Sequence, residues 1–185
     1  MNTYIALLRG INVGGHNSLP MKNLVAIMVN LGLEKIRTFI QSGNVVFDYS
    51  GQDASLLPQK INTEIDQQFR FSPLVIILTL PEFERAVANN PFDHQVSDPR
   101  NLHFGFMASK PEQPDLKRME YLKANSEQFH LTDRVFYLFA PMGIGKSKLA
   151  AQVEKLLGVS MTDRNFRTVQ KLLEIAHAPI NHTKN

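Results

Sequence analysis

The sequence predicts an α+β fold, built from a ferredoxin-like split-βαβ unit that is followed by a second half of mixed helices and strands. Short apolar runs of strand length alternate with segments whose apolar residues recur every three or four positions. Glycine and proline mark the ends of many of these segments. Residues 3–80 carry the element order β-α-β-β-α-β, which is the order of the split-βαβ unit. We therefore expect a mainly antiparallel sheet with two helices on one face.

The first half, residues 1–80, is expected to form one ferredoxin-like subdomain of six elements. It opens with a buried strand at residues 3–9, and Pro20 then begins a helix whose apolar residues keep helical spacing. Gly32 stands where a glycine commonly ends a helix. The remaining expected elements are strands at 36–41 and 45–49, a helix at 56–69 and a strand at 73–80.

The second half, residues 81–185, is expected to form an α+β subdomain with C-terminal helices. No flexible linker marks the division near residue 80. Thr162 or Asp163 is expected to cap the last helix, and residues 181–185 form a polar tail. A weak internal similarity relates residues 4–32 to 135–158, as two related halves would. The other expected elements are helices at 81–89, 116–123 and 148–157, and strands at 102–108 and 134–140.

The composition excludes several kinds of function. The 185 residues include no cysteine, which rules out disulfides, thiolate catalysis and cysteine metal sites. The histidines lack metal-ligand spacing, so we predict no metal site, and no pattern identifies a cofactor. The longest apolar run is too short to cross a bilayer and no signal peptide opens the chain. We therefore expect a cytoplasmic protein that does not bind membranes. The net charge of +3 gives only weak support to a nucleic-acid partner.

Three polar islands interrupt the apolar pattern, and they are the candidate ligand-binding segments. Amide, guanidinium and backbone N–H groups can together hold an anion. For each island the alternative is turn or cap chemistry, in which the polar groups satisfy nearby backbone atoms. We expect at least Arg9, Asn12, Asn44 and Arg164 to lie around one cavity. The candidate residues are Arg9, Asn12, Gly14 and Gly15; Gln41, Ser42 and Asn44; and Arg164, Asn165 and Arg167.

A fourth candidate segment, residues 140–148, reads Ala-Pro-Met-Gly-Ile-Gly-Lys-Ser-Lys and resembles a phosphate-binding loop between a strand and a helix. Its first glycine is replaced by alanine, and Pro141 removes one backbone N–H. The residues after it predict two helices and no further strand, whereas a nucleoside triphosphatase needs one. We therefore expect Lys146 and Ser147 to help hold an anion without hydrolysing ATP.

Five segments share one resemblance: Leu7–Gly15, Gln41–Phe47, Asn90–Phe92, Gly143–Leu149 and Thr162–Val169. They resemble the signature segments of a bacterial family of proteins of unknown function, domain-of-unknown-function family 1697. The similarity extends over nearly the whole chain, and it implies an α+β fold with ferredoxin-like parts and a cytoplasmic location. In that family arginine often stands at the position of Lys146, so a catalytic lysine is not required there. The resemblance implies no activity.

The leading hypothesis is a cytoplasmic domain that binds an anionic ligand through its glycine-rich loops. The ligand would be a small phosphorylated metabolite, a nucleotide or, with less support, a nucleic-acid backbone. An alternative is an enzyme of phosphoryl or nucleotide chemistry, which magnesium-dependent ATP turnover would reveal. A second alternative is a protein-interaction module whose polar islands are structural, and which phosphates and nucleotides would not stabilise.

Overall fold

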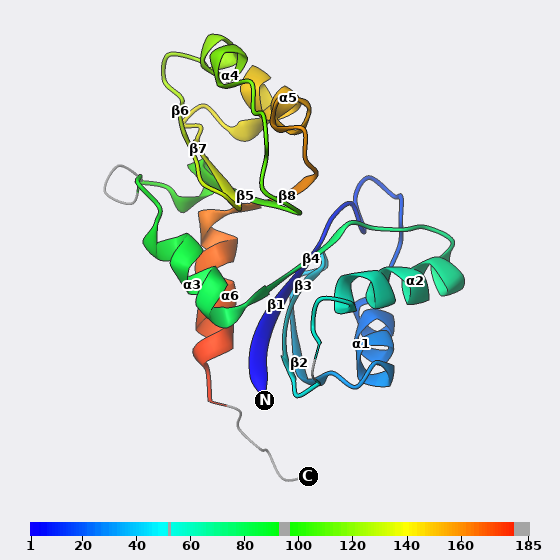
Figure 1. Cartoon of the computed structure of the whole chain (residues 1–185). Helices are drawn as coiled ribbons and strands as arrows, with labels where there is room; N and C mark the ends of the chain where they lie inside the picture. Colours follow the sequence, from blue (N-terminus) through cyan, green and yellow to red (C-terminus); the bar gives the residue numbers. More distant parts are fainter. Residues whose placement is uncertain (52, 93–96, 180–185) are drawn as a thin grey trace. The chain divides into compact units, whose positions relative to one another are not determined.

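The computed structural model describes residues 1–51, 53–92 and 97–179, and its contacts divide the chain into two compact units (Figure 1). Unit 1 comprises Met1–Arg85 together with the chain from Lys171 onward, and unit 2 comprises Ala86–Gln170. The sequence placed a boundary near residue 80 and gave the C-terminal helix to the second half. In the structure α3 (Leu80–Ala88) and α6 (Phe166–His177) each run from one unit into the other. The expected tail at 181–185 lies outside the described residues.

Unit 1 contains a four-stranded antiparallel sheet in the order β2-β3-β1-β4, with the connectivity predicted for residues 3–80. The register places Leu7 of β1 opposite Asn44 of β3 and Leu8 opposite Val75 of β4. The start of β3 and the start of β4 therefore lie at the end of the sheet where β1 ends. The elements are β1 (Asn2–Leu8), α1 (Met21–Asn30), β2 (Glu34–Phe39), β3 (Asn44–Tyr49), α2 (Leu57–Phe69) and β4 (Val75–Thr79).

Helices α1 and α2 cover the same face of this sheet, as the sequence predicted (Figure 1). Their buried residues recur at helical spacing and form one apolar core with alternate residues of β1 and β3. Gly32, with φ +81°, follows the last turn of α1. The N–H of Leu33 donates to the carbonyl of Met28 (3.0 Å) and that of Gly32 to Val29 (2.9 Å), which is the Schellman end expected of such a glycine.

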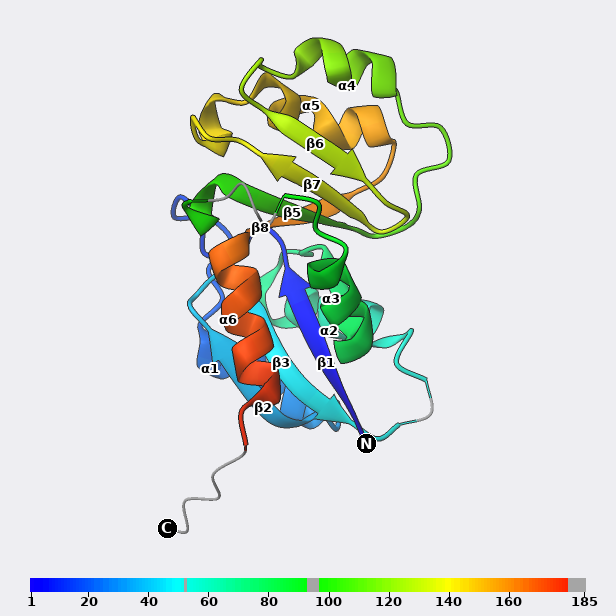
Figure 2. The same ribbon diagram turned by 90° about the vertical axis from the view of Figure 1, so that its left-hand side faces the viewer.

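The other face of the unit 1 sheet contacts the end of α6 (Figure 2). The guanidinium of Arg37, on β2, donates to the carbonyl of Ile175 and to that of Ala178 (3.4 Å). These carbonyls belong to the C-terminal end of α6, where a cation is favourable for the helix dipole. His177 of α6 also lies 3.1 Å from the carboxylate of Glu84 on α3. These contacts fasten the end of the chain to unit 1.

Unit 2 repeats the architecture of unit 1 with a second four-stranded antiparallel sheet, in the order β6-β7-β5-β8. Reading β5 for β1, β6 for β2, β7 for β3 and β8 for β4 gives the same connectivity and the same sheet order. In both units the last strand runs directly into a helix. The elements are β5 (Leu102–Met107), α4 (Leu116–Leu122), β6 (Gln128–Leu131), β7 (Val135–Phe139), α5 (Lys148–Leu157) and β8 (Met161–Asn165), with short 3-10 helices η2 (Pro99–Asn101) and η3 (Ile144–Lys146).

The structure corrects three expectations for the second half. The sequence indicated no strand at β6 and none at β8, where it placed the start of the final helix. The internal similarity was also aligned wrongly, because it matched the segment at β1 with that at β7. The counterpart of β1 is β5, and the counterpart of β7 is β3. The second half is therefore an antiparallel α+β unit of the same kind as the first.

The two faces of the unit 2 sheet have different partners. Helices α4 and α5 form a core with one face, which includes Leu138 and Met161. On the other face Phe104 stacks on Phe166 of α6 with ring centroids 5.4 Å apart, and it meets the edge of Tyr137 at 5.0 Å. Such ring pairs add stability beyond the apolar area that they bury.

The buried phenol of Tyr137 gives the first testable prediction. Its hydroxyl donates to the carbonyl of Ala86 at 2.7 Å, and burial raises the pKa of Tyr137 to about 12. Burial favours the neutral phenol, so the folded state binds this proton more tightly than the unfolded state does. The stability that results is fully present below pH 10 and is lost as the pH rises from about 10 to about 12. We expect a tyrosinate absorbance step near pH 12 that Tyr137→Phe removes. The variant should lose about 1–2 kcal/mol of unfolding free energy, because the carbonyl of Ala86 loses its donor. An unchanged alkaline titration in Tyr137→Phe would contradict this assignment.

Candidate functional site

The first polar island is a small β-hairpin that follows β1, here called the glycine hairpin (residues 11–19). The N–H of His16 donates to the carbonyl of Val13 (3.0 Å), and the N–H of Asn12 donates to that of Asn17 (3.0 Å). Gly14 and Gly15 form the two-residue tip with φ +58° and +79°. Positive φ at both positions is the requirement of a type I′ turn, which explains the glycine pair.

Asn12 connects the glycine hairpin to the second island. Its Oδ1 accepts from the N–H of Leu19 (2.7 Å), and its Nδ2 donates to the carbonyl of Leu19 (2.9 Å) and to that of Gln41 (2.8 Å). Both amide hydrogens and the amide oxygen are thus engaged within the chain. A second amide, Nδ2 of Asn17, donates to the carbonyl of Gly10 (2.9 Å) at the base of the hairpin. The amide of Asn12 therefore braces two segments that are far apart in sequence.

The second island is the turn between β2 and β3, residues 40–43. The carbonyl of Gly43 accepts from the N–H of Leu8 (2.8 Å), which places the turn against the end of β1. Asn44 is fully buried, and its Nδ2 donates to Oγ of Ser42 (2.8 Å) and to the carbonyl of Phe39 (3.3 Å). The side-chain amides of Asn12 and Asn44 thus hydrogen-bond to groups of nearby turns. This is the alternative to ligand binding that the sequence also allowed.

These contacts bring seven predicted residues together at one end of unit 1. We call this region the Asn12 surface, and it consists of residues 9–22 and 40–43. Leu19, held by Asn12, is followed by Pro20 and the first turn of α1, which has no side-chain cap and no acidic residue. Residues 1–33 contain no aspartate or glutamate. The predicted residues here are Arg9, Asn12, Gly14, Gly15, Gln41 and Ser42, with Asn44 directly beneath.

In unit 2 the segment that resembles a phosphate loop lies between β7 and α5, as predicted, but its backbone is largely engaged. The N–H of Gly143 donates to Ala140 (2.9 Å), that of Lys146 to Gly143 (3.1 Å) and that of Ser147 to Ile144 (3.0 Å). Oγ of Ser147 accepts from the N–H of Ala150 (3.0 Å) and caps α5. A strand does follow, contrary to expectation, but β8 is antiparallel to β5. The loop therefore has fewer donors to offer an anion than its sequence indicates.

Arg164 and Asn165 of the third island end strand β8 rather than opening a helix, whereas Arg167 lies in the first turn of α6. Arg164 pairs with Phe104 and Asn165 pairs with His103, so the two side chains point to opposite faces of the sheet. Asn165 caps α6 by accepting from the N–H of Thr168 (2.9 Å). Nη1 of Arg164 donates to Oγ1 of Thr162 (2.8 Å) and to the carbonyl of Asp163 (2.7 Å).

The two arginines of the third island differ in burial and in the charges around them. Burial lowers the pKa of Arg164 to about 10, and the nearby charge of Asp163 partly opposes this. Arg167 is exposed at the start of α6. Hydrogen bonds from Arg100 hold the pKa of Asp98 at about 2, and the charge of Arg167 makes a smaller contribution in the same direction. Arg167 therefore has an acidic group in its surroundings.

A further pair in unit 2, a buried histidine and a half-buried aspartate, was not among the predicted site residues. Nδ1 of His103, on β5, lies 2.8 Å from Oδ2 of Asp163, on β8. The side chain of His103 is 8% exposed and that of Asp163 is 35% exposed. The only signal for it was a histidine within the apolar run of residues 102–107. The carboxylate of Asp163 thus contacts His103, and its charge also acts on Arg164.

Comparison with known proteins places the chain in a family. Residues 1–137 match the family described as Protein of unknown function (DUF1697). The chain belongs to this family. The match includes the whole Asn12 surface and ends within β7. A solved structure of a conserved bacterial protein from Streptococcus pneumoniae is similar over 95% of this chain and 98% of that one, with 29% identity and a TM-score of 0.69. No curated protein matches the chain.

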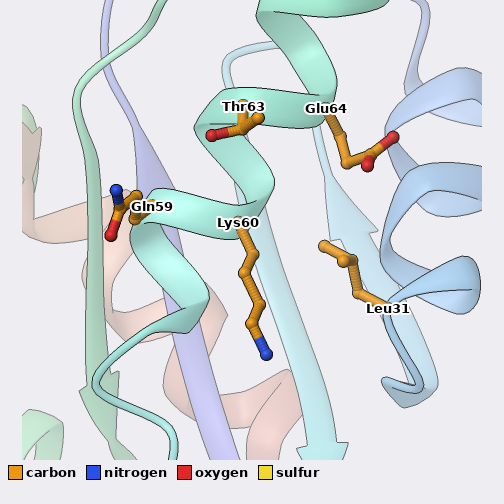
Figure 3. A pocket seen from close by; sticks show the side chains of 5 residues that line it. All are labelled: Leu31, Gln59, Lys60, Thr63 and Glu64. Carbon is orange, nitrogen blue, oxygen red and sulfur yellow. The ribbon is translucent and has the colours of Figure 1, made fainter.

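One hollow on unit 1 of this DUF1697 chain is lined by residues outside the Asn12 surface. It has a volume of about 270 Å³, and Leu31 and four residues of α2 line it: Gln59, Lys60, Thr63 and Glu64 (Figure 3). Strand β3, which precedes α2 in the chain, ends at the end of the sheet opposite Arg9. None of the predicted site residues lines it.

Neither a metal-binding cluster nor a membrane-spanning helix is present among the residues that the structure describes. Residues 1–51, 53–92 and 97–179 contain no group of three acidic or histidine residues that could hold a metal ion. No helix of this part of the chain is long and apolar enough to cross a membrane.

The expected cavity shared by Arg164 with Arg9, Asn12 and Asn44 would combine residues of both units, and it stays a prediction.

Proposed function

We propose that the protein binds an anionic ligand that carries a phosphate group, and that the Asn12 surface of unit 1 is the principal contact. The supporting observation is that Asn12 closes the glycine hairpin by its bonds to Leu19, just before α1, and ties this hairpin to the β2–β3 turn by its bond to Gln41. A loop fixed in this way has little conformational freedom to lose when a ligand binds.

The charge distribution of this surface favours an anion. Arg9 and Lys22 are both exposed, and no acidic residue occurs among residues 1–33 or in the turn at 40–43. The N-terminal end of α1 carries the positive end of a helix dipole, and it lacks an acidic residue that would neutralise it. The three contributions have the same sign, which supports an anion as the ligand.

The test is a titration with inorganic phosphate and pyrophosphate, followed by backbone amide NMR. We expect chemical-shift changes confined to residues 9–24 and 40–44, saturating in the millimolar range or below. Arg9→Ala should weaken binding about tenfold, because it removes a charged partner. Lys60→Ala is the matched control, since it removes an exposed cation that lies on α2, outside the Asn12 surface, and should leave binding unchanged. The proposal is wrong if no amide responds, or if Arg9→Ala and Lys60→Ala have the same effect.

A further inference from the structure

Two exposed aliphatic residues lie next to the hydrogen bond between Asn12 and Gln41, which joins the two segments of the Asn12 surface. Val13 is 62% exposed and follows Asn12, and Ile40 is 54% exposed and precedes Gln41. Since Nδ2 of Asn12 lies 2.8 Å from the carbonyl of Gln41, the two aliphatic residues lie on neighbouring backbone segments. They add two exposed apolar side chains, together called the patch, to a surface whose charged residues are basic.

Ile40 also has an unfavourable backbone conformation. Its φ is +50°, in the left-handed region that β-branched residues strongly avoid. Asparagine or glycine would adopt this turn conformation with less strain. More than half of the isoleucine side chain is exposed, so burial in the core does not compensate fully for the strain. Strained exposed residues of this kind occur at ligand contacts more often than elsewhere.

The patch is too small to be the core of a stable protein interface. Such interfaces bury roughly 800 Å² on each partner. Among the described residues of unit 1, the other exposed large apolar residues lie outside the Asn12 surface, before β1, near the end of α1 and before α2: Met1, Val29 and Leu56. Two aliphatic side chains beside a cationic surface instead match a ligand with one flat apolar group next to a phosphate.

We infer that the anionic ligand is a nucleotide, whose phosphate contacts Arg9 and the start of α1 and whose base packs on Val13 and Ile40. This inference rests on the proposed function and adds the class of ligand to it. Binding a base face by apolar contact is sequence-tolerant, and it adds affinity to a phosphate contact that is weak alone. The same chemistry can come from a mononucleotide or from a single-stranded nucleic acid.

The experiment compares inorganic phosphate, AMP, a labelled single-stranded RNA and a polyglutamate peptide as probes. We expect AMP to bind at least about tenfold more tightly than phosphate. The double variant Val13→Ser/Ile40→Asn should remove most of that difference between AMP and phosphate. Asparagine tolerates positive φ, so this variant is expected to fold, which circular dichroism checks. Val29→Ser is the matched control, because it removes an equally exposed valine from the far end of α1.

The outcomes separate the inference from the proposal on which it rests. Equal affinity for phosphate and AMP, or an AMP affinity unaffected by the double variant, overturns the inference and leaves anion binding intact. Absence of binding by every probe overturns both. Polyglutamate binding that requires Val13 and Ile40, without a preference for AMP over phosphate, identifies an acidic protein surface and overturns the inference. If RNA binds more tightly than AMP and its binding weakens with salt, the inference is supported and the source of the nucleotide is a nucleic acid. If RNA and AMP bind with equal affinity, the inference is supported and the source is a mononucleotide.

Discussion

Gly43→Ala is expected to destabilise unit 1 by about 3 kcal/mol. A Cβ at this position would lie 2.6 Å from Cβ of Leu8 and 3.2 Å from its carbonyl oxygen. Leu8 is 1% exposed and its N–H bonds to Gly43, so neither residue can move without disturbing the end of β1. The φ of +74° lies in the left-handed region, which costs free energy for alanine but not for glycine. Hydrogen exchange of the β1 amides, together with urea unfolding, measures the loss.

Gly14→Ala is the control for the backbone contribution. Gly14 has a positive φ of +58°, but a Cβ there would meet nothing within 4 Å. It should therefore cost only the left-handed strain, about 1 kcal/mol. Equal losses in the two variants would show that the close approach of Gly43 to Leu8 contributes nothing. Gly43 would then be needed only for its conformation.

The sequence predicted the elements whose apolar residues have a clear period. Helix α2 is an example, with Leu57, Ile61 and Ile65 buried at spacings of four. Strand β8 has no such signal, because four of its five residues, Thr162 to Asn165, are polar. Its half-exposed position at the edge of the sheet allows polar residues. The helix-cap signal was real, but the cap is Asn165 rather than Thr162 or Asp163.

Strand β6 was missed for a different reason. Gln128–Leu131 alternates exposed and half-buried residues over only four positions, too few for a period to stand out. Its pairing with β7 identifies it. Without β6 and β8 the repeat of the β-α-β-β-α-β order could not be recognised, and the internal similarity was aligned on the wrong strands.

The candidate site was predicted as a set of residue types rather than as a geometry. Asn12 and Gln41 are 29 positions apart, and nothing in either segment indicates that an amide of one meets a carbonyl of the other. The glycine pair at 14–15 could be read as a turn or as an anion loop. Its position at the tip of a hairpin decides for the turn, while leaving the surface that the hairpin carries open to a ligand.

Asn12→Ala is expected to cost about 3 kcal/mol and to uncouple the two islands. The variant removes two donated hydrogen bonds and one accepted bond, each contributing about 1 kcal/mol net. Alanine must also adopt φ +55°, which asparagine tolerates better. We expect faster amide exchange in residues 11–19 and 40–43, and weaker binding of phosphate, because the surface is no longer held in one conformation. Urea unfolding and amide exchange give the two readouts.

Asn12→Gly separates the amide from the backbone. Glycine loses the same three hydrogen bonds but adopts positive φ without strain, so it should be more stable than Asn12→Ala by about 1 kcal/mol. Faster exchange at residues 40–43 in both variants, with β4 unaffected, would show that the amide of Asn12 holds the β2–β3 turn against the hairpin. If exchange in the turn stays at its original rate, the contact of Gly43 with Leu8 alone positions it. Asn12 would then stabilise only its own hairpin, and the proposal of one preorganised surface would lose its main support.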